Sequence, residues 1–360
     1  MKIKAIRSYI KKLALKKSYT IAYNTYTDVE LVFVEIELAN GIIGLGTGSP
    51  AEDVVGETAN QTLKNIQSDY IQTLIGRDIR HFQQLIFEIV RHFPHLPGTQ
   101  AAIDIALHDA FCKYLGIPVV DFYGRKIKSL PTSVTIGIKP LNETIAEAAE
   151  YAQMGFKILK LKTGIHVEED IERVIKLMEK FKHQFKIRID ANQGYDLSTL
   201  EHFLNATKKH SIELIEQPLL VGNELELLKL DSSNRKTIAG DESIKDPAAA
   251  LQFAATPQPF GIFNIKLMKC GGLIGAHQIA QIAQNAHIDL FWGCNDESIL
   301  SITAGLHIAY ACSNTKYLDL DGSLDLAEDL VNGGFNIEDG CMVINQDPGF
   351  GTNLINQVRV

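Results

Sequence analysis

From residue 131 onward, short apolar runs alternate with amphipathic stretches such as EEDIERVIKLMEKF and GAHQIAQIAQNA. The apolar runs have the length of strands, and the stretches between them repeat with the period of a helix. We expect eight strands, at 133–138, 157–162, 186–190, 212–216, 237–241, 263–267, 289–293 and 317–321. The polar ends of the last seven follow one another every 25 to 28 residues, the length of one strand plus one helix. This regular spacing predicts an α/β fold of the (β/α)₈ TIM-barrel type rather than an open sheet.

The first 125 residues show a different pattern. Alternating runs around 1–16 and 29–38, and a third run after the Asn40-Gly41 turn, predict an antiparallel meander. Helical periodicity fills 51–125. We therefore expect an α+β N-terminal domain over residues 1–125 and a barrel domain over residues 126–324. The Gly-rich segment 325–360 should return to pack on the N-terminal domain.

Composition and charge limit the class of protein. Apolar residues make up 46% of the chain and charged residues 22%, and the net charge is -8 with a pI near 5.8. This balance argues against nucleic-acid binding through a basic surface. The five cysteines form no CxxC pair, and no apolar run reaches the length of a membrane span. The basic N-terminus predicts a strand with solvated lysines rather than a transit peptide. We expect a cytoplasmic protein with no membrane partner.

Carboxylates end three consecutive predicted strands: Asp190, Glu216 and Asp241. In a TIM barrel, the C-terminal ends of the strands form the active site, so these three side chains should converge. A lone acid at a strand end is most often a helix N-cap or a loop acceptor. Three converging anions instead require a compensating cation, and oxygen ligands favour Mg²⁺ first and Mn²⁺ second.

Two lysine positions accompany these acids. Lys160 and Lys162 project to one side of the second strand, so each should depress the pKa of the other. Taken alone, a K-x-K pattern is more often a solvated strand face. Lys266 ends the sixth strand, opposite the second in an eight-stranded barrel, and Lys269 should lie on the following loop or helix start. Two opposed bases suit an epimerisation in which Lys162 and Lys266 remove and return a proton on opposite faces of one carbon.

Two other patterns have structural interpretations. None of the eleven histidines joins the acids and lysines, and His108, on an apolar helix, should be a packed or hydrogen-bonded core residue. The run Gly271-Gly272-x-x-Gly275 lacks the full dinucleotide fingerprint, so it predicts a close turn into a helix.

The motifs KLKTG, RIDANQGY, IEQPL, GDES and NIKLMKCGG, in this order, resemble those of the muconate-lactonising subgroup of the enolase superfamily. The resemblance covers nearly the whole chain. It implies an α+β capping domain over a modified TIM barrel, with Mg²⁺ on Asp190, Glu216 and Asp241. The same resemblance implies that Lys162 and Lys266 are the acid/base pair and that Lys160 assists Lys162. Asn192 and Glu242 would orient the metal ligands.

Asp319 and Asp321 distinguish among the activities of this subgroup. Strand alternation places both carboxylates on one face of the eighth strand, where they would attract a cation such as the α-ammonium of a peptide. This D-x-D resembles the signature of dipeptide epimerases. A loop-capping pair is the structural alternative. N-acylamino-acid racemase and o-succinylbenzoate synthase stay open as other activities, and a silent relative kept as a binding protein stays open as another class.

The loop that covers the site in this subgroup corresponds here to TIAYNTYTDVE, which contains no Arg or Lys. Asn24 and Tyr26 are its candidate substrate-binding residues. The resemblance makes an L-Ala-D/L-Glu dipeptide the first expected substrate, in murein peptide metabolism, and a homo-oligomeric enzyme the expected state. Because Asn24 cannot neutralise an acidic side chain, a dipeptide with a neutral or apolar second residue is the competing substrate.

Overall fold

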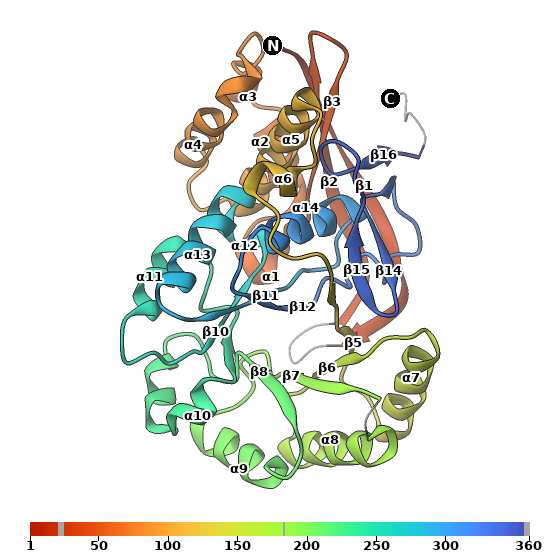
Figure 1. The fold of residues 1–360 in the computed structure, drawn as a ribbon, viewed down its shortest axis with the longest axis vertical. Helices are drawn as coiled ribbons and strands as arrows, with labels where there is room; N and C mark the ends of the chain where they lie inside the picture. Colours follow the sequence, from red (N-terminus) through yellow and green to blue (C-terminus); the bar gives the residue numbers. More distant parts are fainter. Residues whose placement is uncertain (21–24, 183, 356–360) are drawn as a thin grey trace.

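The computed structural model describes residues 1–20, 25–182 and 184–355 (Figure 1). The N-terminal strands form an antiparallel sheet in the order β1-β2-β3, as the alternating runs predict. Their bounds are β1 Ile3–Thr20, β2 Thr25–Leu38 and β3 Ile43–Gly48. The first two strands form a long ribbon that runs from the capping helices down beside the barrel (Figure 1).

The helices of the N-terminal domain cover one face of this sheet. They are α1 Glu52–Val55, α2 Ala59–Ile66, α3 Asp69–Gln72, the 3₁₀ turn η1 Ile79–His81, α4 Phe82–His92, α5 Pro97–Leu115 and α6 Val119–Tyr123. Helix α5 lies directly on β3, where a Cβ on Gly46 would come within 2.1 Å of the Ala102 carbonyl oxygen. The glycines of β3 therefore allow this close approach.

The barrel sheet is parallel throughout, in the order β12-β11-β10-β9-β8-β7-β6-β5. Its strands are β5 Val134–Ile136, β6 Ile158–Lys162, β7 Lys186–Asp190, β8 Ile212–Glu216, β9 Ile238–Gly240, β10 Ile262–Ile265, β11 Asp289–Trp292 and β12 Thr315–Leu318. Among the described residues, one parallel bridge, Thr132 to Leu318, joins the two ends of the sheet. The predicted barrel is therefore confirmed, with a seam between β12 and β5.

Helices follow the strands around the outside of the barrel (Figure 1). They are α7 Leu141–Gln153, α8 Val167–Phe181, α9 Leu197–Thr207, η2 Glu224–Lys229, α10 Ser232–Arg235, α11 Pro247–Ala254, α12 Leu267–Cys270, α13 Leu273–Asn285 and α14 Ile299–Tyr310. In the part of the chain that the structure describes, no helix combines the length and apolarity needed to cross a membrane.

Several strands end earlier than predicted. Asp241 follows β9, which ends at Gly240, and Lys266 follows β10, which ends at Ile265. The eighth strand was expected at 317–321, but β12 stops at Leu318, so Asp319 and Asp321 follow the strand instead of lying on it. The physical reason is a change of partner: beyond Leu318, the backbone N–H of Leu320 donates to the side chain of Thr132, just ahead of β5, and leaves the parallel ladder.

The C-terminal segment carries short strands: β13 Val331–Gly333, β14 Phe335–Glu338, β15 Cys341–Ile344 and β16 Thr352–Leu354, with β15 pairing to β4 Leu130–Pro131. Lys16 N donates to Asp325 O at 2.7 Å, and Val119 N donates to Gly349 O at 2.9 Å. The segment thus contacts the N-terminal domain at β1 and at α6, while the domain boundaries themselves stay predictions.

Helix α5 also joins the two large parts of the fold. The Asp104 carboxylate accepts hydrogen bonds from Leu273 N and Ile274 N at the start of α13, at 2.8 and 3.3 Å. Gly272, with φ 108°, brings the chain against Asp104, so the glycine run is a close turn into a helix, as expected. His108 is buried between the Asp104 carbonyl and the Tyr123 hydroxyl, as a core histidine should be.

Candidate active site

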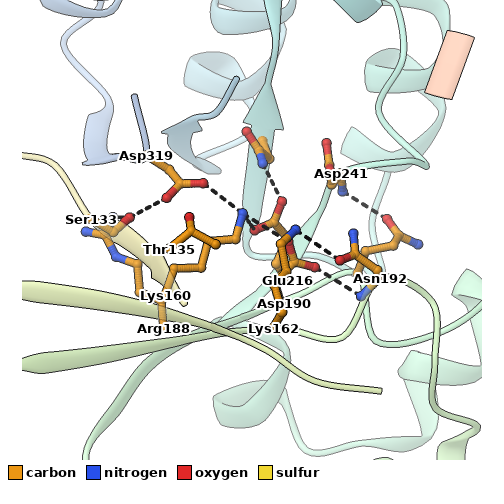
Figure 2. Close-up of polar contacts among 12 residues, drawn as sticks. Ser133, Thr135, Lys160, Lys162, Arg188, Asp190, Asn192, Glu216, Asp241 and Asp319 are labelled. Atoms are coloured by element: carbon orange, nitrogen blue, oxygen red, sulfur yellow. Dashed lines mark hydrogen bonds and ion pairs between the residues drawn. The ribbon is translucent and has the colours of Figure 1, made fainter. Parts of the chain in front are cut away.

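The strand register gathers the predicted acids and lysines at the C-terminal end of the barrel (Figure 2). Neighbouring strands place Lys162 beside Asp190, and Asp190 beside Glu216. One row lower, Lys160 lies beside Arg188, and Arg188 beside Leu214. Since alternate residues share a face, both rows point into the barrel.

Lys160 is the central cation of the site. Its ammonium lies 2.9 Å from Asp190 Oδ2, 2.8 Å from Glu216 Oε2 and 2.7 Å from Asp319 Oδ2 (Figure 2). Burial alone would lower the pKa of Lys160, but these three carboxylates outweigh burial and raise it well above the usual value. The expectation that the paired lysine depresses the pKa of Lys160 is therefore wrong, because acids surround this ammonium on three sides.

Lys162 belongs to a second group of contacts. Its ammonium lies 2.7 Å from Asp190 Oδ2 and 3.0 Å from Asn192 Oδ1. Asn192 donates its backbone N–H to Asp190 Oδ1 and its side-chain amide to Glu242 Oε1, at 3.0 and 3.3 Å. Asn192 therefore contacts both Lys162 and Asp190, and Glu242 in turn accepts a hydrogen bond from Asn192.

Two lysines hold Asp241, one on each oxygen. Lys266 lies 2.9 Å from Oδ2, on the side of the cavity. Lys269, on α12, is buried. Its ammonium donates to Asp241 Oδ1 and to the backbone carbonyls of Asp241 and Asn264, so each of its three N–H groups has an acceptor. Burial lowers the pKa of Lys269, whereas Asp241 and Glu216 outweigh burial at Lys266 and raise its pKa. Lys269 lies at a helix start, as expected, but its contact with Asp241 was not foreseen.

The three acids expected to bind metal are buried but separated by ammonium groups. In residues 1–20, 25–182 and 184–355, no cluster of three acid, imidazole or thiol side chains is close enough to hold a metal ion. Lys160 stands between Asp190 and Glu216, and Lys266 holds Asp241. Their chemistry nevertheless suits a hard cation. Burial and the nearby charge of Asp190 raise the pKa of Glu216 to about 8. A further positive charge beside Glu216 would therefore stabilise its ionised form.

Strand β5 fixes the D-x-D pair at the seam. The Ser133 hydroxyl lies 2.6 Å from Asp319 Oδ1, and Thr135 N donates to Asp321 Oδ2 at 2.7 Å. Both acids still reach the cavity despite following the strand. Burial and the charges of Asp319 and Asp325 raise the pKa of Asp321 to about 8. No lysine or arginine among the described residues forms an ion pair with Asp321, so it can receive an external cation.

A cavity of about 520 Å³ lies over these groups, between the barrel mouth and the N-terminal domain. Its floor contains Lys160, Lys162, Lys266, Asn192, Asp319 and Asp321. Its wall includes residues of β1, β2, α1 and α7. Asn24 lies outside the described residues, as does the side chain of Tyr26, so these two expected substrate contacts stay predictions.

Sequence reasoning did not foresee the contacts by which four polar residues support the site: Arg188, Ser133, Asn264 and Lys269. Asn264 donates to Glu216 Oε1 at 2.6 Å. The signal for three of them was available. Arg188 lies two residues before Asp190, Asn264 two before Lys266, and Ser133 opens the first strand, so alternation puts all three on the inward face.

Comparison with known proteins shows the family of this chain. Residues 6–124 match the family described as Mandelate racemase / muconate lactonizing enzyme, N-terminal domain, and residues 143–358 match Enolase C-terminal domain-like. An L-Lys-D/L-Arg epimerase of Desulforapulum autotrophicum is 50% identical over 99% of this chain and 100% of its own length. A hydrophobic dipeptide epimerase of Enterococcus faecalis is 34% identical over 94% of this chain and 95% of its own.

Among solved structures, a dipeptide epimerase from Methylococcus capsulatus complexed with Mg and the dipeptide L-Arg-D-Lys superposes with a TM-score of 0.96. It is 45% identical, and the match covers 98% of this chain and 99% of that one. The relatives share the fold and the type of reaction but differ in the dipeptide that each is named for.

Proposed function

The chain belongs to the mandelate racemase and muconate lactonizing enzyme group of the enolase superfamily and is an isomerase, and on this premise we propose that it is a Mg²⁺-dependent epimerase of cationic dipeptides. The observation that carries the substrate class is the acid-rich cavity. Among the described residues, its lining holds nine carboxylates and six lysines. A substrate with basic side chains would complement this surface, and an acidic one would be repelled.

The lysines of the cavity wall are already engaged. Lys17 pairs with Glu150 at 2.7 Å, Lys139 pairs with Glu147 at 2.6 Å, and Lys16 donates to the Leu324 carbonyl at 2.8 Å. These ammonium groups are therefore poor candidates for binding an acidic substrate side chain.

Four acids of the cavity have no cationic partner among the described residues. No ion pair with a described residue neutralises Glu30, Glu52, Asp321 or Asp325. Burial and the neighbouring acids Asp296 and Glu147 raise the pKa of Asp325 to about 7, a sign of excess negative charge. Two relatives named L-Lys-D/L-Arg epimerase, at 50% and 46% identity, support the same substrate class. This proposal replaces L-Ala-D/L-Glu as the first expected substrate.

The proposed mechanism uses two lysines, Lys162 at the end of β6 and Lys266 just after β10, with three strands between β6 and β10. Asp190, Glu216 and Asp241 would hold Mg²⁺, which supplies the positive charge that acidifies the α-proton of a chelated carboxylate. Lys162 and Lys266 would remove the α-proton and return it on the opposite face. Lys266 lies 2.9 Å from Asp241 and would therefore stand beside the metal site. Lys160 stays charged and offsets the acids, and Asp319 and Asp321 would bind the substrate α-ammonium.

Exchange of the α-proton in D₂O tests the proposal. The protein with Mg²⁺ is incubated with L-Lys-L-Arg, L-Ala-L-Glu or L-Leu-L-Tyr, and deuterium uptake is followed by NMR. We expect kcat/KM for L-Lys-L-Arg to exceed that for L-Ala-L-Glu by about 100-fold or more, and its KM to rise with salt. A preference for L-Ala-L-Glu would contradict the cationic specificity, and absence of exchange on all three would contradict the activity.

A further inference from the structure

Arg188 is a buried cation one row below the candidate active site. Its side chain, 1% exposed, fills the barrel beneath Lys160 and lies 5.3 Å over the rings of Phe291 and Tyr317. At its base, Nε donates to Glu213 Oε2 at 2.7 Å. The proposed reaction gives Arg188 no role. Burying the charge of an arginine costs free energy unless opposite charges and hydrogen bonds compensate for the lost hydration.

The far end of Arg188 reaches the seam of the barrel. Its Nη1 donates to the Leu318 carbonyl, at the end of β12, and to the Ser133 hydroxyl, just ahead of β5, the latter at 3.1 Å (Figure 2). The Thr132–Leu318 bridge is the only β-bridge that joins these two strands among the described residues, and Ser133 N also donates to Leu318 O, at 3.0 Å. Arg188 therefore spans the point where the ladder is weakest.

These contacts determine where the Ser133 hydroxyl proton goes. Ser133 Oγ accepts from Arg188 and has one proton to donate, with Asp319 Oδ1 at 2.6 Å and Leu318 O at 3.2 Å as acceptors. Leu318 O already accepts from Arg188 and from Ser133 N, which uses both of its lone pairs. The proton therefore points to Asp319.

The result is a chain of charged and polar contacts that leads from the interior of the barrel to its mouth. It runs from Glu213 through Arg188 and Ser133 to Asp319, and from Asp319 to Lys160 at 2.7 Å. Asp319 has one oxygen on Ser133 and the other on Lys160, so its carboxylate plane cannot turn freely (Figure 2). Charge-assisted hydrogen bonds of this kind are the strongest that fix a side chain.

We propose that Ser133 and Arg188 are positioning residues for the amine subsite, holding Asp319 in the orientation that receives the α-ammonium of the dipeptide. This inference rests on the proposed function, because it assumes a substrate with a free amine. Arg188 acts through Ser133 and never touches the substrate. If Ser133 and Arg188 only stabilised the seam, their replacement would instead weaken the binding of every ligand of the cavity equally.

The test compares a ligand that has the α-amine with one that lacks it. L-Lys-L-Arg is the substrate, and 6-aminohexanoyl-L-arginine keeps the side-chain amine and the peptide bond but has no α-amine. We measure KM for the former and the competitive inhibition constant for the latter in wild type, Ser133→Ala and Arg188→Lys. Thr207→Val is the matched control, because it removes a buried hydroxyl, bonded to Phe203 O at 2.7 Å, on the outer helix α9.

We expect Ser133→Ala to raise KM about tenfold or more, the effect of losing a hydrogen bond to a charged group, and to leave the inhibition constant unchanged. Arg188→Lys should act in the same direction, since one ammonium cannot contact Glu213 and the seam at the same time. Thr207→Val should change neither constant. Equal weakening of both ligands in Ser133→Ala would overturn the inference and leave the proposed function intact. A wild type that exchanges no α-proton would overturn both.

Discussion

Lys160 and Asp319 meet at 2.7 Å across the barrel mouth, one from β6 and the other from the turn that follows β12. The same ammonium also contacts Asp190 and Glu216, so three buried carboxyl groups share one buried cation.

Replacement of Lys160 by methionine should destabilise the metal-free protein by about 3 kcal/mol or more, because it leaves three carboxylates without their shared partner. Mg²⁺ should recover more stability in Lys160→Met than in wild type, since it supplies the missing charge. Thermal unfolding with and without Mg²⁺ measures both effects. Lys176→Met, which breaks an exposed pair with Glu179, is the control and should have little effect. Equal melting temperatures for Lys160→Met and the control would contradict the charge balance.

Lys162→Ala and Lys266→Ala should each lower epimerisation by about 1000-fold or more, because each removes one of the two groups proposed to transfer the α-proton. The two variants should differ in a specific way. Each should keep slow deuterium exchange with only one of the two epimers, the one whose α-proton faces the remaining lysine. NMR with L-Lys-L-Arg and L-Lys-D-Arg detects the difference. If either variant epimerised at the wild-type rate, the two-base mechanism would be wrong.

Lys269→Met should weaken Mg²⁺ binding by about 10- to 100-fold, the usual cost of losing an outer partner of a metal ligand. The physical reason is that Lys269 fixes the Asp241 oxygen that Lys266 does not hold. Isothermal titration with Mg²⁺ measures this without reference to activity. Lys316→Met, which breaks an exposed pair with Asp289, serves as the control. Unchanged Mg²⁺ affinity in Lys269→Met would show that Asp241 needs no support or binds no metal.

The acid limb of the pH profile should belong to Asp321. Its pKa is raised to about 8, and only its ionised form attracts an ammonium, so KM should fall as the pH rises toward 8. Above that, the substrate α-amine loses its proton, with an ordinary pKa of about 7.7–8.0, and KM should rise again. Asp321→Asn should raise KM and remove the acid limb. A limb that persists in this variant would assign it to another group.

The raised pKa of Asp321 also makes the stability of the folded protein depend on pH. The folded protein keeps the Asp321 proton up to about pH 8, whereas an unfolded aspartate releases it near 3.9. The contribution of Asp321 to the free energy of unfolding is therefore fully present below about pH 4 and is lost as the pH rises toward 8. In thermal melts without ligand, Asp321→Asn should lose less stability than wild type between about pH 5 and pH 8. A parallel loss in both proteins would contradict the raised pKa.

Asp104→Ala should lower stability by about 1–2 kcal/mol, because the N-terminus of α13 loses its cap. The cap comes from α5, a helix of the N-terminal domain, so the change should also loosen the contact between the two parts. Hydrogen exchange at Leu273 and Ile274 would show the loss locally. Asp246→Ala, which uncaps α11 within the barrel domain, is the control that should leave those two amides protected.

Much of the site could be predicted because strand periodicity maps sequence onto space in a simple way. Strands repeated every 25 to 28 residues placed Asp190, Glu216 and Lys266 at one mouth, and alternation placed Lys160 and Lys162 on one face. These inferences need only the local geometry of a strand and the closure of a barrel. The motif resemblance then narrowed the chemistry to proton transfer, which the comparisons support.

Only the tertiary structure decided which charge meets which. Strand periodicity does not predict that Lys160 pairs with Asp319, 159 residues away, or that Lys269 contacts Asp241. Those contacts depend on side-chain reach across the barrel, and they reverse the expected direction of the Lys160 pKa. The end of β12 and the acid-rich wall likewise follow from packing between distant segments. The sequence by itself determined the barrel, the face of each strand and the groups at its mouth. The contacts between charged groups, and with them the basis of the proposed substrate preference, were decided by the fold, because electrostatic energy depends on distance in space and not along the chain.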